Sequence, residues 1–81
     1  MRFRKLSKLR FQFGHLAPDC TADEIAMALS HSGHIEVITR EDGLQKYAET
    51  DLMRAIPKDR FEFEISKSIT NFLSLRQRGE S

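Results

Sequence analysis

The chain of 81 residues is long enough for one small domain, and we expect residues 1–81 to form it, with about residues 79–81 as a frayed tail. One cysteine excludes an internal disulfide framework, and the absence of an apolar run of about 18 residues argues against a membrane span. These features favour a cytoplasmic protein, or a nuclear one if the source is eukaryotic. The net charge of +1 conceals a basic N-terminal segment, because residues 1–13 hold five bases and no acid.

Residues 3–13 alternate between apolar and polar side chains, most regularly over residues 8–13. Phe11 and Phe13 share one parity, and charged or amide side chains occupy the other. Period-two alternation with aromatic residues is typical of a half-buried strand. We therefore predict a first strand whose phenylalanines face the core.

The next segment predicts an amphipathic helix that begins after Thr21 and ends at Gly33. Thr21 is a good N-cap, and Glu24, three residues later, completes a capping box. The apolar face of this helix consists of Ala22, Ile25, Ala26 and Leu29.

The second half of the chain predicts four further elements after a strand over residues 34–40. Asp42-Gly43 is typical of a hairpin turn, so residues 44–48 are predicted to form the return strand. A short helix over residues 51–56 stops at Pro57, and "RFEFEI" at 60–65 alternates as a strand does. The last helix has Ile69, Phe72 and Leu73 on one side.

This order predicts an α+β fold, a ferredoxin-like βαββαβ sandwich with a four-stranded antiparallel sheet and an extra C-terminal helix. In that fold the fourth strand lies beside the first. Lys8 and Arg10 are then expected to face Glu62 and Glu64, with roughly 0.2–1 kcal/mol of stabilisation per pair.

Residues 11–38, "FQFGHLAPDCTADEIAMALSHSGHIEVI", resemble the first half of an RNA recognition motif. The resemblance lies in a strand, a Gly14-His15-Leu16 turn, a capped helix, Gly33 and a second strand. It implies the ferredoxin-like fold and binding of unstacked bases on sheet aromatics. This chain has Gln12, Leu44 and Lys46 where the family carries those rings, so contacts to phosphates are expected to replace stacking.

The sequence therefore predicts a small non-enzymatic protein that binds RNA or single-stranded DNA through phosphate contacts from its basic first strand. The alternative is that these basic residues have no binding role and form a solvated strand face neutralised by Glu62 and Glu64. The predicted nucleic-acid-binding residues are Arg2, Arg4, Lys5, Lys8, Arg10, Gln12 and Lys46.

A protein-binding regulator is the other open prediction, an inhibitor or adaptor such as mobile genetic elements encode. It would act through the sheet face or through Phe72, Leu75 and Arg76 on the last helix. A homodimer through this helix or an edge strand is a further alternative.

No cofactor and no metal site is predicted. Gly33 separates His31 from His34, and Cys20 stands at the other end of the helix without Cys-x-x-Cys spacing. A glycine-rich phosphate loop and a nucleophile elbow are both absent from the sequence, which favours a binding protein over an enzyme.

Overall fold

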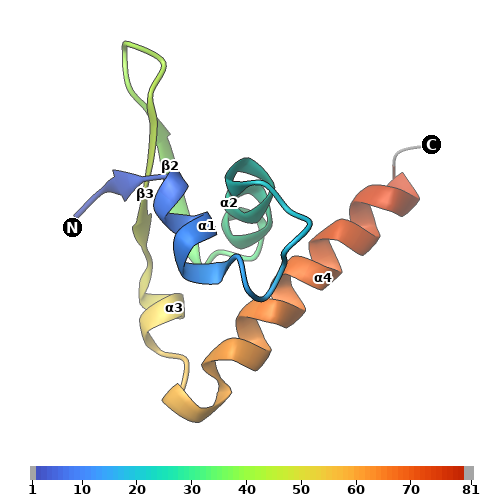
Figure 1. Ribbon diagram of the computed structural model, residues 1–81. Helices are drawn as coiled ribbons and strands as arrows, with labels where there is room; N and C mark the ends of the chain where they lie inside the picture. The colour runs from blue at the N-terminus through green and yellow to red at the C-terminus, as the bar shows by residue number, and fades with distance from the viewer. Residues whose placement is uncertain (1, 80–81) are drawn as a thin grey trace.

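The computed structural model describes residues 2–79, with side chains for residues 2–77. Within this range the protein has an α+β architecture of four α-helices and a three-stranded antiparallel sheet (Figure 1). Residues 80 and 81 of the predicted tail lie outside the described residues. In chain order the elements are β1 (Arg4–Lys5), α1 (Ser7–Phe13), α2 (Ala22–His31), β2 (Ile35–Thr39), β3 (Gln45–Glu49), α3 (Asp51–Arg54), the 3₁₀ turn η1 (Lys58–Arg60) and α4 (Phe61–Gly79).

The sheet has the strand order β1-β3-β2, and both strand pairs are antiparallel. β2 and β3 form a hairpin whose turn contains Gly43 at φ +87°, a left-handed conformation that glycine adopts without steric cost. β1 adds two residues to the other edge of β3, with Arg4 opposite Tyr47 and Lys5 opposite Lys46. The N-terminal segment is therefore held against the central strand.

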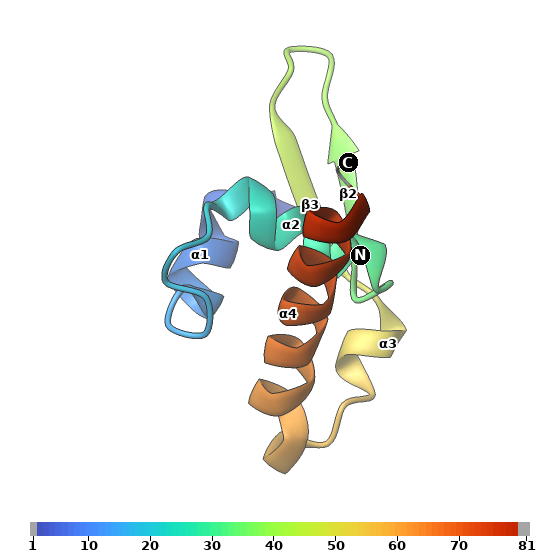
Figure 2. The ribbon, with the colours of Figure 1, turned by 90° about the vertical axis from the view of Figure 1, so that its right-hand side faces the viewer.

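α2 is the centre of the helical packing. Figures 1 and 2 show α1 and α2 on one side of the sheet, with α4 packed on α2 away from the sheet. None of the described helices is long and apolar enough to cross a membrane. The largest fully buried side chains come from all of these layers, and they are Leu9, Ile25, Leu29, Tyr47 and Ile65.

The predicted helix after Thr21 is confirmed as α2. Thr21 Oγ1 accepts a hydrogen bond from the backbone N–H of Glu24 at 3.2 Å, and Glu24 Oε1 accepts one from the backbone N–H of Thr21 at 2.8 Å. This is the predicted capping box. The predicted hairpin and the short helix before Pro57 are confirmed as β2–β3 and α3.

The predicted ferredoxin-like fold with a four-stranded sheet is wrong. The predicted first strand over residues 8–13 is helix α1, and the predicted strand at 60–65 falls on η1 and the first turns of α4. The sheet thereby loses its expected first and fourth strands, and β1, two residues long, occupies the place beside β3.

A helical face underlies each misread segment. In α1, Leu9 and Phe13 are buried together with Leu6, which just precedes the helix, at the spacing i, i+3 and i+7. In α4, Ile65 and Ile69 are buried at the spacing i, i+4. The buried side chains of both segments follow the helical period, and tertiary packing of such a face stabilises the helix.

Candidate nucleic-acid interface

Basic side chains gather around a surface hollow of about 840 Å³ where β1, α1 and β3 meet. We call this hollow and its lining the basic hollow. β1 supplies Arg4 and Lys5, the first turn of α1 supplies Lys8, and β3 supplies Lys46. The complete lining is Arg2, Phe3, Arg4, Lys5, Lys8, Phe11, Gln12 and Lys46.

The residues predicted to bind nucleic acid therefore lie together, with the exception of Arg10. Arg2, Arg4, Lys5, Lys8, Gln12 and Lys46 all line the basic hollow. Arg10 is exposed on α1 but does not line it. Lys46 joins the others because β3 is the direct neighbour of β1, although some forty residues separate the two strands in sequence.

Two lysines face each other across the centre of this surface. Lys5 of β1 and Lys46 of β3 are directly opposite in the antiparallel register. Directly opposite residues project from the same face of a sheet with their Cβ atoms about 5 Å apart, and like charges in such a pair destabilise the sheet. The fold therefore concentrates positive charge here at a cost in stability.

The acids expected to neutralise the basic segment are engaged elsewhere. Because residues 61–65 are helical, Glu62 and Glu64 do not lie on a strand beside the first one, and their predicted pairing with Lys8 and Arg10 is wrong. Glu62 Oε2 is 3.3 Å from His15 Nε2, and Glu64 Oε2 is 3.2 Å from Arg60 Nη2. Among the ion pairs formed by residues 2–77, none includes a cation that lines the basic hollow.

An exposed aromatic ring stands within this positive surface. The Phe11 side chain on α1 is 88% exposed, and Lys8 Nζ lies 5.9 Å from the centre of its ring. Strand alternation wrongly predicted Phe11 for the core. The helical period corrects this, because Phe11 lies off the face formed by Leu6, Leu9 and Phe13.

The three residues of the alternative partner-binding prediction have different environments on α4. Phe72 is partly buried, with its ring centre 5.5 Å from that of His31. Arg76 Nη1 is 3.4 Å from Glu24 Oε2 on α2. Leu75 is exposed, and so is Phe63, which also lies on α4.

The histidines and the cysteine lie in separate environments. In the part of the chain that the structure describes, no group of three or more His, Cys, Asp or Glu side chains is placed to hold a metal ion. Burial raises the pKa of the Cys20 thiol, with a further contribution from Glu24. Burial lowers the pKa of His34, whose Nδ1 lies 2.6 Å from Ser32 Oγ and 3.3 Å from Ser68 Oγ.

No family model matches the chain, and no curated protein or solved structure is significantly similar to it. The resemblance to the RNA recognition motif therefore stays a prediction from the sequence. Any functional conclusion rests on the residues of the surface itself.

Proposed function

We propose that the protein binds single-stranded nucleic acid, RNA or DNA, by contacting phosphates with the basic hollow and stacking a base on Phe11. The observation that carries the proposal is the cluster of cations without acidic partners around an exposed ring. Phosphates would neutralise this cluster, and an aromatic ring is the usual platform for an unpaired base.

Phosphate contact accounts for the unfavourable arrangement of Lys5 and Lys46. Like charges that oppose each other in a sheet lower stability unless a counter-charge lies between them. A strand of nucleic acid carries one negative charge per nucleotide and releases its condensed counterions when lysine and arginine replace them. The same electrostatics make binding fall steeply as salt rises.

Phe11 favours a single strand over a duplex. In a duplex the base faces are already stacked on one another, whereas an unpaired base has a face available to an aromatic ring. Stacking on such a ring contributes roughly 1–3 kcal/mol per base. Lys8 Nζ lies close to the Phe11 ring, so a cation for phosphate stands next to the surface on which a base would stack.

Recognition of duplex DNA by α2 is a less favourable reading. α1, α2 and the following hairpin have the connectivity of a winged helix-turn-helix, in which the second helix enters the major groove. The exposed residues of α2 include Asp23, Met27 and Ser30, and the hairpin turn carries Glu41 and Asp42. These carboxylates would repel the phosphates that flank a groove.

A protein-binding regulator is the second candidate, and exposed apolar side chains on α4 favour it. Phe63 is 59% exposed and Leu75 is 52% exposed. Aromatic and aliphatic side chains of this size are common anchors when a helix docks into a groove of another protein. Under this proposal α4, and not the basic hollow, would respond to the partner.

Fluorescence anisotropy with labelled strands of about ten nucleotides, a length in the usual range of single-strand sites, tests the proposal. Lys8→Gln should weaken binding and reduce the slope of log K against log salt by about 0.7 for each phosphate that Lys8 neutralises. Arg10→Gln is its matched control, because it removes the same charge from the same helix outside the hollow.

Phe11→Ala and Phe63→Ala form the second matched pair. Both side chains are exposed phenylalanines on helices, but only Phe11 lines the basic hollow. We expect Phe11→Ala to weaken binding by roughly 1–3 kcal/mol and Phe63→Ala to leave it unchanged. Absence of binding at low salt, or equal effects of Lys8→Gln and Arg10→Gln, would contradict the proposal.

A further inference from the structure

A second, smaller hollow adjoins the basic hollow, and Arg4 of β1 lines both. Its volume is about 110 Å³, against about 840 Å³ for the basic hollow, and it shares Arg2 and Arg4 with that hollow. We call it the arginine hollow, and its lining residues are Arg2, Arg4, Tyr47, Ala48, Glu49 and Arg54. Its volume corresponds to about four water molecules in the liquid, which is too small for a nucleoside but sufficient for a tetrahedral anion.

The Tyr47 hydroxyl has no hydrogen-bond partner among the described residues, although Tyr47 is only 1% exposed. A buried hydroxyl without a partner is uncommon and is an indication of an unseen ion, water or ligand. Burial raises the pKa of the Tyr47 phenol, and the charge of Arg4 together with a loose contact from its guanidinium to the phenol oxygen partly opposes that change. The phenol therefore keeps its proton at neutral pH and needs an acceptor, which the guanidinium of Arg4 cannot provide.

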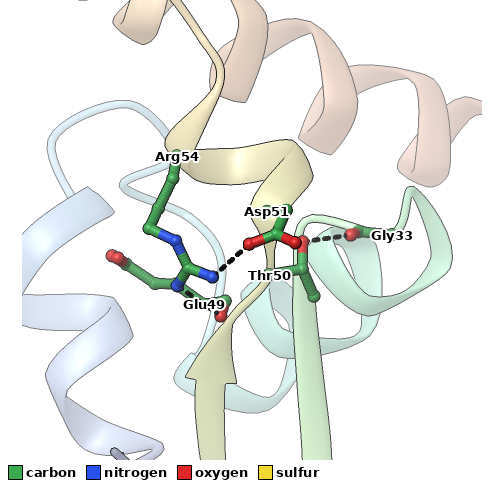
Figure 3. A network of polar contacts seen from close by, with 5 residues as sticks. All are labelled: Gly33, Glu49, Thr50, Asp51 and Arg54. Atoms are coloured by element: carbon green, nitrogen blue, oxygen red, sulfur yellow. Dashed lines mark hydrogen bonds and ion pairs between the residues drawn. The ribbon is translucent and has the colours of Figure 1, made fainter. Parts of the chain in front are cut away.

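Arg54 is held in place at the edge of the arginine hollow. Figure 3 shows its guanidinium between the backbone carbonyl of Glu49 and the carboxylate of Asp51. Arg54 Nη1 donates to Glu49 O at 3.1 Å, and Nη2 donates to Asp51 Oδ1. A guanidinium has five N–H donors, so further donors remain for a ligand after these two contacts.

Arg2 and Arg4 add donors from β1 and the residues before it. Arg4 lies directly opposite Tyr47 in the β1–β3 register, on the same face of the sheet. Neither arginine forms an ion pair with an acid in the described part of the chain. Guanidinium groups match the oxygens of phosphate with paired N–H donors, whereas a cation would offer them no acceptor.

We infer that the arginine hollow is a phosphate-binding site in which Arg2, Arg4, Arg54 and the Tyr47 hydroxyl donate to the oxygens of one phosphate group. The phosphate can belong to a nucleic-acid strand or be free in solution. That the phosphate belongs to a nucleic-acid strand rests on the proposed function, whereas the existence of the phosphate site does not. No bond forms or breaks in this binding.

Glu49 is the competing acceptor in the same hollow. Its carboxylate would repel an anion, and its removal should strengthen phosphate binding. Glu49→Gln is therefore expected to bind phosphate more tightly than the unmodified protein, by about threefold to tenfold for a partly exposed neighbouring charge. Weaker binding in this variant would contradict the assignment of the ligand as an anion.

Tyr47 is itself the reporter for the test, because the chain has one tyrosine and no tryptophan. The protein is titrated with inorganic phosphate at constant ionic strength in chloride, and tyrosine emission is recorded. We expect a saturable change in emission. Arg4→Gln should weaken the response about tenfold, as expected for loss of a charge-assisted hydrogen bond, whereas Arg10→Gln, which lies outside both hollows, should leave it unchanged.

Tyr47→Phe tests the hydroxyl with a nearly isosteric side chain. Because this variant loses the fluorophore, the readout is the shift of the backbone amide signals of residues 4, 47 and 54 in NMR spectra during the phosphate titration. Dispersed spectra in the absence of phosphate confirm that the variant is folded. We expect smaller shifts and weaker binding than in the unmodified protein.

Two single-stranded oligonucleotides of identical sequence, one with a 5′-phosphate and one with a 5′-hydroxyl, identify the source of the phosphate. A change in Tyr47 emission with the phosphorylated strand alone assigns a strand end, and a change with both assigns internal phosphates. A change with inorganic phosphate and with neither strand assigns free phosphate, so that the site stands, and the proposed function fails only if neither strand binds in the anisotropy assay. No change with any of the three overturns the phosphate site, and it leaves the proposed function standing if both strands still bind in the anisotropy assay.

Discussion

Lys5 and Lys46 lie directly opposite each other across the antiparallel pair of β1 and β3. No acid in the described part of the chain forms an ion pair with either of them. The pair joins the N-terminal segment to the central strand and places two like charges opposite each other. A surface kept at a cost in stability is typical of a binding site.

Lys46→Gln should therefore raise the free energy of unfolding while it weakens nucleic-acid binding. The expected gain is about 0.2–1 kcal/mol at low salt, because one of two opposed like charges is removed, and it should shrink as salt screens the repulsion. Urea unfolding at low and at physiological salt measures it. A loss of stability at low salt would show that Lys46 has a stabilising partner.

Thr21→Ala should destabilise the protein by about 1 kcal/mol, because it removes the side-chain half of the capping box at the start of α2. Thr70→Ala is the matched control, because Thr70 is exposed on α4 away from a helix end, and its expected effect is within about 0.5 kcal/mol. Equal effects of the two substitutions in urea unfolding would contradict the role of the cap.

Acid should destabilise the protein through His34. Burial lowers the pKa of this imidazole in the folded state, and Glu64 partly opposes the change. As pH falls below the ordinary histidine pKa of about 6.5, the unfolded chain takes up the proton first, so the stability present above that pH is lost. The loss continues until pH passes the folded-state pKa.

Urea midpoints between about pH 7.5 and pH 5 measure this effect above the range in which most carboxylates titrate. His34→Gln serves as the control, because it keeps a polar side chain near Ser32 and Ser68 without the titration. The slope of stability against pH should be smaller in that variant. Identical slopes in the two proteins would assign the pH dependence to other groups.

Cys20 should react slowly with thiol reagents in the folded protein. Its side chain is only 6% exposed, and burial raises its pKa, which lowers the fraction of reactive thiolate. Labelling should accelerate strongly in urea, where the thiol is exposed. A native rate equal to the denatured rate would contradict the burial of this residue in the core.

Local signals in the sequence predicted the middle of the fold well. The capping box at Thr21, the Asp42-Gly43 turn and the stop at Pro57 each act within a few residues, so the hydrogen bonds and backbone angles they require do not depend on distant packing. The elements between residues 21 and 56 follow from these signals.

The two ends of the chain were misread for one shared reason. In each, an exposed phenylalanine lies two residues from a buried apolar side chain, Phe11 before Phe13 and Phe63 before Ile65. Two such residues imitate the period of a strand in a short window. The helical spacing becomes visible only when Leu6 and Ile69 are included.

The charge of the candidate site was predictable, but its aromatic ring was not. A run of bases without acids is visible in the sequence regardless of secondary structure. Phe11 could be assigned to the surface only after its segment was known to be helical. Lys46 was predicted with the other cations, and the β1–β3 pairing is what brings it beside them.

The most direct test of nucleic-acid binding by the basic hollow is a residue-resolved NMR titration with single-stranded RNA and DNA at low and at physiological salt. We expect shifts at Lys5, Lys8, Phe11, Gln12 and Lys46 that diminish as salt rises, with α4 unaffected. The absence of shifts at low salt, or shifts confined to α4 around Phe63 and Leu75, would contradict it.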